Sequence, residues 1–185
     1  TFGAGRTAYF PWPLHALLMR LLGLPNDADP ETIRQAAEQW LTNGGDPFAR
    51  RTAELLAATF GAGEGEHVDR GELFAAWRSA IERAAQEQPL VVVIEDLHWS
   101  SDTLLDLIEV ILQPRGEAAL LMIVLARPEL LDRRPTWGGG RRNYVSLNLE
   151  PLDDLAIAAL VDHLLQGPPP EIVETVVERA EGNPF

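Results

Sequence analysis

The chain has no cysteine and no lysine among its 185 residues. The missing cysteine excludes a disulfide scaffold, a thiol nucleophile, an iron–sulfur cluster and a cysteine-ligated zinc site. The missing lysine excludes a Schiff base, and it excludes a phosphate loop of the GK[ST] type within these residues. All 15 basic residues are arginine, and 28 acidic residues leave a net charge of −13. That charge argues against direct contact between this segment and a nucleic-acid backbone.

Long apolar runs are also missing. The longest spans residues 118–126, whereas a membrane-spanning helix needs about 20 residues. Residues 1–6 carry neither a charged leader nor an export-type apolar core. We therefore expect a cytoplasmic globular protein with no membrane contact. Because neither end has the composition of a natural terminus, we also expect the chain to be a segment of a longer protein.

Helical periodicity, interrupted by glycine and proline, dominates the first half of the chain. Asp29 followed by Pro30 is a helix start, with an acidic N-cap and proline at the first helical position. The pattern predicts further helices over residues 13–22, 51–60 and 70–86.

The middle of the chain changes character. Residues 90–94 and 120–125 are unbroken apolar runs with a helical stretch, 103–112, between them. This pattern is typical of parallel strands that are buried on both faces. The alternation of Val145, Leu147 and Leu149 predicts a third strand, and helices are expected over 153–165 and 170–180. The fold class is thus α/β, with a sheet domain over residues 1–150 and the start of a small helical segment over 151–185.

Glu95 and Asp96 directly follow the first apolar run. They are therefore expected at the carboxyl edge of a parallel sheet, where ligands bind in open α/β folds. Carboxylates there can hold Mg²⁺ through its waters and polarise a water for attack on a phosphate. The alternative is a strand that ends in solvent. Arg127 is the first polar residue after the second run, so it belongs to the same edge, either to read a terminal phosphate or to pair with the two acids.

Six stretches, taken in order, resemble the STAND branch of the AAA+ P-loop ATPases. The closest resemblance is to the ATPase module that accompanies tetratricopeptide repeats and either a class III nucleotide cyclase domain or a LuxR-type DNA-binding domain. Residues 93–99 resemble the family's Walker B segment, and residues 125–131 resemble its sensor-1 strand. The other matching stretches are residues 3–14, 138–143, 149–152 and 181–185.

The resemblance implies a P-loop NTPase sheet, Mg²⁺ and ATP or ADP as ligands, and a helical lid subdomain that begins at residue 151. Glu95 would hold the Mg²⁺ shell through water, Asp96 would orient or activate the hydrolytic water, and Arg127 would sense the γ-phosphate. Gly182 and Pro184 would pack against the adenine. The function implied is a slowly hydrolysing ATP switch that controls an attached cyclase or DNA-binding domain, whose neighbouring domains would be its partners together with ATP.

Two departures from the family pattern matter. The family's acid after the tryptophan is displaced by one position to Asp102, which puts a fixed role for that residue in doubt. The phosphate loop and its lysine are expected to precede Thr1, so this chain alone is expected to bind ATP weakly and to be inactive. The sequence leaves two other functions open: an interaction scaffold derived from the same fold, and a self-associating mechanical AAA+ motor.

Several other features carry less weight. Residues 3–8 fit a loose dinucleotide pattern but follow no strand, the glycines at 138–140 suggest a flexible loop, and the four histidines have no ligand spacing. An arginine-rich stretch is either a solvated loop that balances nearby acids or a source of a finger for an adjacent subunit. Its members are Arg133, Arg134, Arg141 and Arg142, of which Arg141 or Arg142 would be the finger in a motor.

Overall fold

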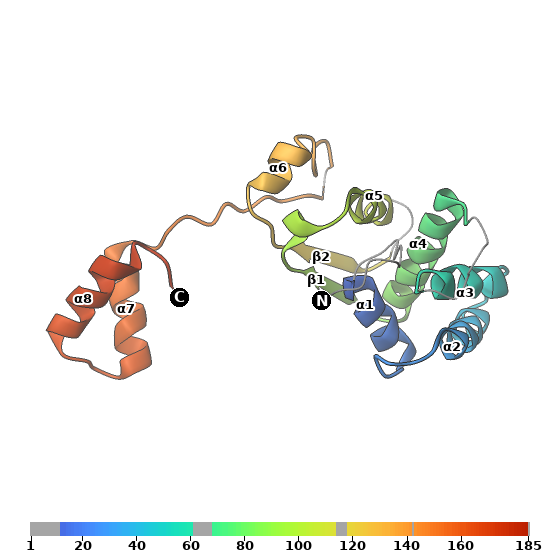
Figure 1. Cartoon of the computed structure of the whole chain (residues 1–185), viewed down its shortest axis with the longest axis horizontal. Helices are drawn as coiled ribbons and strands as arrows, with labels where there is room; N and C mark the ends of the chain where they lie inside the picture. Colours follow the sequence, from blue (N-terminus) through green and yellow to red (C-terminus); the bar gives the residue numbers. More distant parts are fainter. Residues whose placement is uncertain (1–11, 61–67, 114–117, 142, 185) are drawn as a thin grey trace, which may run out of the picture. The chain divides into compact units, whose positions relative to one another are not determined.

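The structure is a computed structural model of the whole chain, and it describes residues 12–60, 68–113, 118–141 and 143–184. Its contacts divide the chain into two compact units, Thr1–Trp137 and Gly138–Phe185 (Figure 1). The predicted domain boundary after residue 150 falls inside the second of these units.

The described residues ahead of the first strand form helices, as the periodicity predicted. Asp29 caps its helix by accepting hydrogen bonds from the backbone N–H groups of Glu31 and Thr32, and Asp69 caps a later helix by accepting one from Glu72. The caps fix where these helices begin. The four helices are α1 (Trp12–Leu22), α2 (Pro30–Asn43), α3 (Ala49–Ala58) and α4 (Arg70–Glu87).

Strands β1 (Leu90–Ile94) and β2 (Leu120–Val124) pair in parallel, from Leu90 opposite Leu120 to Ile94 opposite Val124. The connection between them contains α5 (Asp102–Ile111), so the predicted strand–helix–strand order is confirmed. Two parallel strands and predominantly helical surroundings make the chain a mixed α/β protein.

The prediction that both faces of these strands are buried is wrong for the described chain. Val92 and Ile94 are buried in the core that includes α5, but the side chains on the other face are open. Val91, Val93 and Leu121 are each more than half exposed, at 56%, 54% and 55%. The apolar runs therefore have the composition of doubly covered strands, while the described residues cover only one face.

A buried arginine joins α4 to the far end of α5. The Arg78 side chain is 7% exposed, and its Nε lies 2.7 Å from a carboxylate oxygen of Glu82. Its other two nitrogens donate to the backbone carbonyls of Val110 and Gln113, at 3.1 and 2.9 Å. These carbonyls lie at the C-terminal end of α5, where the last carbonyls lose their regular helical donors. The Val110 carbonyl also accepts the Gln113 N–H at 3.3 Å, and Arg78 adds a side-chain donor to both carbonyls and so ties the helix to α4.

The second unit is a hairpin of α7 (Asp154–Leu165) and α8 (Pro170–Ala180), both close to their predicted ranges. The predicted third strand does not form among the described residues. Val145, Leu147 and Leu149 lie in irregular backbone and are 78%, 81% and 88% exposed. Their alternation is that of a strand, but a strand also needs a hydrogen-bonding neighbour, and the described part of the chain gives them none.

None of the helices in the described ranges is both long enough and apolar enough to cross a bilayer.

Candidate functional site

The loops that follow β1 and β2 lie side by side at the carboxyl edge of the sheet. Beyond the last paired residues, the Leu125 N–H donates to the Ile94 carbonyl at 2.9 Å, and the Leu97 N–H donates to the Leu125 carbonyl at 3.1 Å. Parallel pairing therefore continues into both loops. It brings the stretch that carries Glu95 and Asp96 to the same edge as the stretch that carries Arg127, as the sequence predicted.

Asp96 adopts a left-handed backbone conformation, with φ 53° and ψ 33°. Aspartate tolerates this region better than most residues, although it still carries a conformational cost. The turn ends β1 abruptly and starts the short 3-10 helix η1 (Leu97–Trp99). Non-glycine residues in such conformations cluster at functional sites, so the turn at Asp96 independently marks this edge as a candidate site.

The three candidate side chains at this edge are exposed and unengaged. The side chains of Glu95, Asp96 and Arg127 make no hydrogen bond or ion pair with any residue that the structure describes. The alternative in which Arg127 pairs with the two acids is therefore not realised among those residues. One cationic and two anionic groups that remain available for outside partners suit a ligand carrying both phosphate and a divalent cation.

His98 lies beneath this edge and is 7% exposed. Its Nδ1 accepts a hydrogen bond from the backbone N–H of Arg127, with 3.4 Å between the nitrogens. Its Nε2 is buried and has no partner among the described residues. This contact could not be expected from sequence pattern, because a helix and a strand separate the histidine from the arginine along the chain.

Arg133 and Arg134 lie at the end of the short helix α6 (Glu129–Arg133), which contacts η1. Each guanidinium lies 3.1 Å from the same carboxylate oxygen of Asp102, the first residue of α5. The hydrogen bonds from Arg134 and then Arg133 lower the pKa of Asp102 below its ordinary value. These two arginines thus balance nearby acids, and the displaced Asp102 has a structural partner in each of them.

The structure neither supports nor contradicts the predicted arginine finger at Arg141 or Arg142. Arg142 lies outside the described residues, and Arg141 is half-buried in irregular backbone. Both remain predictions. The stretch over residues 3–11, with its loose dinucleotide pattern, likewise lies outside the described residues.

Gly182 and Pro184 belong to the second unit. Gly182 has φ +80°, and a Cβ built there would lie 2.8 Å from the Leu152 carbonyl oxygen. Its own carbonyl accepts a hydrogen bond from the Leu152 N–H at 2.9 Å. Gly182 is therefore required by the packing at the end of α8, and Pro184 is exposed after it. Contact of either residue with adenine remains a prediction.

The carboxylates at the sheet edge fit part of a Mg²⁺ site. No cluster of three or more histidine, cysteine, aspartate or glutamate side chains suited to a metal occurs in the described ranges. Mg²⁺ does not need such a cluster, because it retains several waters and is commonly held by one or two carboxylates plus substrate phosphates. Glu95 and Asp96 supply that number of carboxylates, without a phosphate loop in the described chain.

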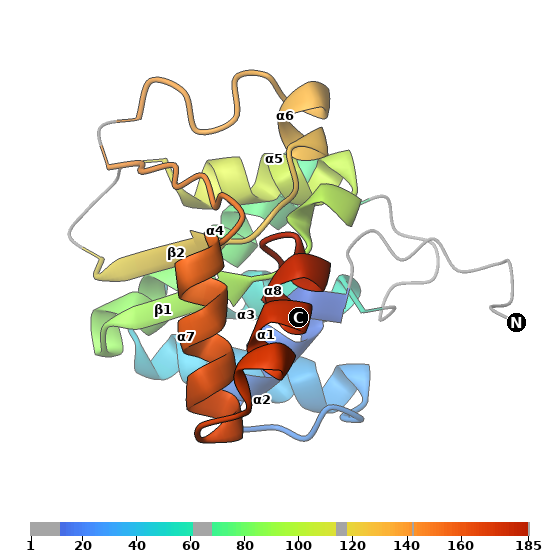
Figure 2. The same cartoon turned by 90° about the vertical axis from the view of Figure 1, so that its left-hand side faces the viewer.

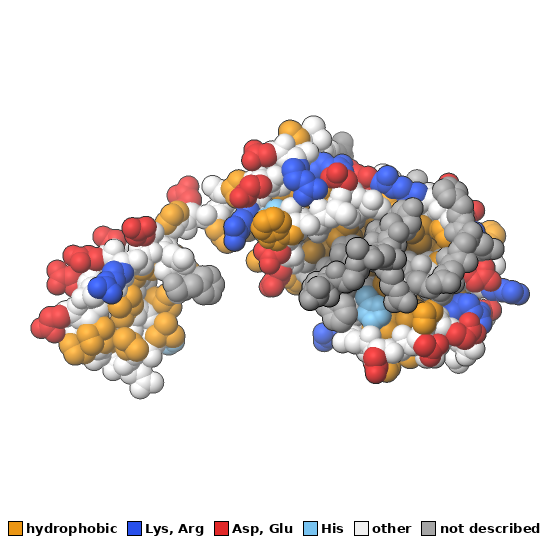
Figure 3. Space-filling model, in the orientation of Figure 1, with side chains coloured by type: hydrophobic (Ala, Val, Ile, Leu, Met, Phe, Trp, Pro, Cys, Tyr) orange, Lys and Arg blue, Asp and Glu red, His pale blue; other side chains and the backbone are white. Residues whose placement is uncertain are grey.

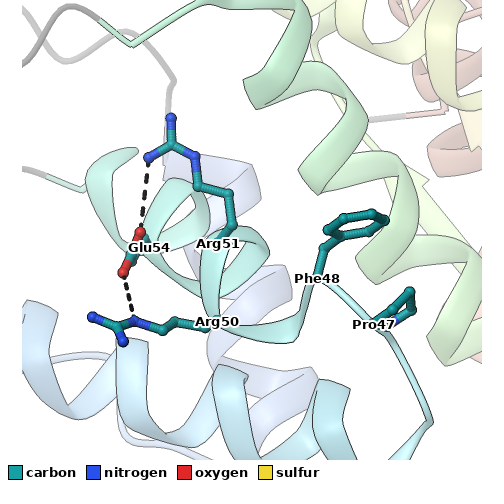
Figure 4. A pocket seen from close by; sticks show the side chains of 5 residues that line it. All are labelled: Pro47, Phe48, Arg50, Arg51 and Glu54. Atoms are coloured by element: carbon teal, nitrogen blue, oxygen red, sulfur yellow. Dashed lines mark hydrogen bonds and ion pairs between the residues drawn. The ribbon is translucent and has the colours of Figure 1, made fainter.

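The surface hollows elsewhere in the first unit have few free ligand-binding groups among the described residues, and Arg20, in the second of them, is a charged side chain without a described partner. One lies beside α3 and is lined by Pro47, Phe48, Arg50, Arg51 and Glu54 (Figure 4). Arg50 and Arg51 both pair with Glu54, at 3.1 and 3.7 Å. A second hollow adjoins α1 and the open face of β1, where Glu87 is already paired with Arg83 at 2.6 Å. The sheet edge remains the stronger candidate.

No protein-family model, curated protein or solved structure matches this chain.

Proposed function

We propose that the chain belongs to an ATP-dependent switch module of the P-loop NTPase type, with the carboxyl edge of β1 and β2 as its nucleotide-sensing part. The observation that carries this proposal is that Glu95, Asp96 and Arg127 lie at one sheet edge and that their side chains have no partner among the described residues. Exposed charges without partners are available for a ligand at no cost in broken ion pairs.

Each residue has a distinct task. Bound Mg²⁺ supplies charge neutralisation for the phosphates. Glu95 holds the water shell of that ion, and Asp96 orients the attacking water. Arg127 binds the γ-phosphate through its planar guanidinium, a contact that ADP lacks. The ATP-bound and ADP-bound forms therefore differ at Arg127, and this difference drives the switch that is read by a cyclase or DNA-binding neighbour.

The open apolar face of the sheet also supports the proposal. Val91, Val93 and Leu121 are the residue types of a strand covered on both faces. We propose that further elements outside the described residues complete a nucleotide-binding sheet and supply its phosphate loop. The helical hairpin of α7 and α8 is then the start of the lid, and the module is cytoplasmic.

Calorimetric titration of the full-length protein with Mg·ATP and Mg·ADP tests the proposal. Arg127→Ala should weaken ATP binding by about tenfold or more, because a charged hydrogen bond contributes about 1.5–3 kcal/mol, and should leave ADP binding unchanged. Asp96→Asn should preserve ATP affinity while slowing hydrolysis by a factor of about 10² or more. Arg50→Gln, which breaks an exposed ion pair away from the edge, is the matched control.

An interaction scaffold is the second candidate. Figure 3 shows apolar side chains gathered on the unit that contains α7 and α8, and four of them are 45–82% exposed. Apolar patches of this kind commonly mark contact surfaces. The four side chains are Leu155, Leu164, Leu165 and Ile172. Failure of the wild-type full-length protein to bind either nucleotide would favour the scaffold over the switch.

A further inference from the structure

The loop that carries Arg127 is tied to the loop after β1 by side chains as well as by backbone. On one side, the Arg127 N–H donates to Nδ1 of His98. On the other, Nη1 of Arg133 donates to the His98 carbonyl at 2.8 Å, and Nη2 donates to the Ser100 carbonyl at 3.1 Å. Arg127 therefore lies between two attachments to the same short segment. Figure 2 shows α6, which carries Arg133, at the same end of the strands as η1.

Arg133 is suited to this task by its geometry. Its guanidinium contacts two carbonyl oxygens and the Asp102 carboxylate at the same time. A single exposed ion pair contributes little to stability, but a planar group with several fixed acceptors holds one geometry. A lysine at this position would offer a point charge in place of that fork. The contact therefore fixes the orientation of α6 relative to η1 and not only its proximity.

His98 completes the attachment from within. Because its Nδ1 accepts the Arg127 N–H, a neutral ring carries its proton on Nε2, and we assign that tautomer from the hydrogen bond. The ring is 7% exposed, so packing restricts its rotation. It holds the backbone of Arg127 and leaves the guanidinium free, since that side chain makes no hydrogen bond or ion pair with any residue that the structure describes.

We propose that His98 and Arg133 are positioning residues that hold Arg127 at the sheet edge and so set the preference of the site for a nucleoside triphosphate over a diphosphate. This inference rests on the proposed function. Neither residue contacts the ligand. Both act through the loop that carries Arg127. If this loop is already ordered before the ligand binds, the guanidinium contacts a terminal phosphate without the entropy loss of ordering the loop.

Binding measurements on the full-length protein test the consequence for ligand preference. The affinities for Mg·ADP and for a non-hydrolysable Mg·ATP analogue are compared among wild type, Arg133→Gln and the control Arg50→Gln. Arg133→Gln should reduce the preference for the triphosphate by about fivefold or more, with ADP affinity within about twofold of wild type. The double variant Arg127→Ala/Arg133→Gln should bind no more weakly than Arg127→Ala alone, since both act through one group.

Hydrogen exchange without nucleotide tests the attachment separately. Arg133→Gln should accelerate exchange over residues 125–131 while leaving α2 unchanged, and Arg50→Gln should change neither. Unchanged exchange over residues 125–131 would overturn the proposal whatever the binding data show. Equal loss of both nucleotide affinities would reduce Arg133 to a purely structural role and overturn it as well. If wild type shows no triphosphate preference, the proposed function fails, and the exchange result still decides whether Arg133 holds the loop.

Discussion

Replacing Arg78 by methionine should loosen the C-terminal end of α5 and thereby destabilise the whole of this helix, which begins at Asp102. Methionine has a similar length and no hydrogen-bond donor, so the change removes the contacts to the Val110 and Gln113 carbonyls and to Glu82 with little loss of packing volume. The Arg78 side chain is 7% exposed, and its loss removes the side-chain donor from both carbonyls, of which Val110 keeps the backbone N–H of Gln113 at 3.3 Å.

The expected cost follows from these contacts. Two carbonyls that lose a charged donor cost about 1–2 kcal/mol each. Glu82 retains water because it is 33% exposed, so loss of its ion pair adds less than the several kcal/mol that breaking a buried pair would cost. We therefore expect the free energy of opening α5 to fall by about 2–4 kcal/mol. Arg50→Met is the control, since its exposed i,i+4 pair with Glu54 contributes about 0.5 kcal/mol or less.

Native-state hydrogen exchange across residues 102–111 measures this free energy directly. Arg78→Met should lower protection over the whole helix, whereas Arg50→Met should leave it unchanged. Equal protection in the two variants would show that Arg78 contributes no more than a surface arginine, and the assignment of Arg78 as the residue that fixes α5 would then be wrong.

Two further predictions concern other parts of the chain. Hydrogen bonds from Arg34 lower the pKa of Glu31 to about 2. The ion pair therefore stabilises the fold above the ordinary glutamate pKa, and this stabilisation is lost as the pH falls towards 2. NMR titration of Arg34→Ala should show the Glu31 pKa return towards 4.5, and an unaltered pKa would contradict the contact. Gly182→Ala should destabilise the α7–α8 unit by about 2 kcal/mol, because Gly182 has a left-handed backbone and the new Cβ would clash with Leu152. Hydrogen exchange across α8 measures this loss, and protection equal to that of wild type would refute it.

Local signals made the strands and helices predictable. The first apolar run coincides with β1, and the helix predicted over residues 170–180 coincides with α8. Both elements are specified by their own residues: an unbroken apolar run for the strand, and a proline at the first helical position for the helix. The prediction of a third strand failed because strand formation depends on residues outside the segment. Val145, Leu147 and Leu149 have the right alternation, but strand formation depends on a neighbour that sequence pattern does not reveal, and none occurs among the described residues.

The candidate site was predictable only in part. Glu95, Asp96 and Arg127 were identified because each directly follows an apolar run, and parallel pairing brings such positions to one edge. The contacts of His98 and Arg133 were not predictable, since they depend on how η1 and α6 pack. The role of Arg78 was equally unpredictable, because its position in α4 does not indicate that its side chain donates to the carbonyls of Val110 and Gln113.

Paramagnetic relaxation by Mn²⁺·ATP tests the central claim most directly. In full-length protein with labelled methyl groups, Mn²⁺·ATP should broaden the signals of Ile94, Leu97 and Leu125 at the sheet edge, and Glu95→Gln should reduce that broadening. Signals of Ile33 and Leu41 in α2 should remain sharp. Broadening that is absent, or that is equal at the two places, would contradict a Mg²⁺-nucleotide site at the carboxyl edge of β1 and β2.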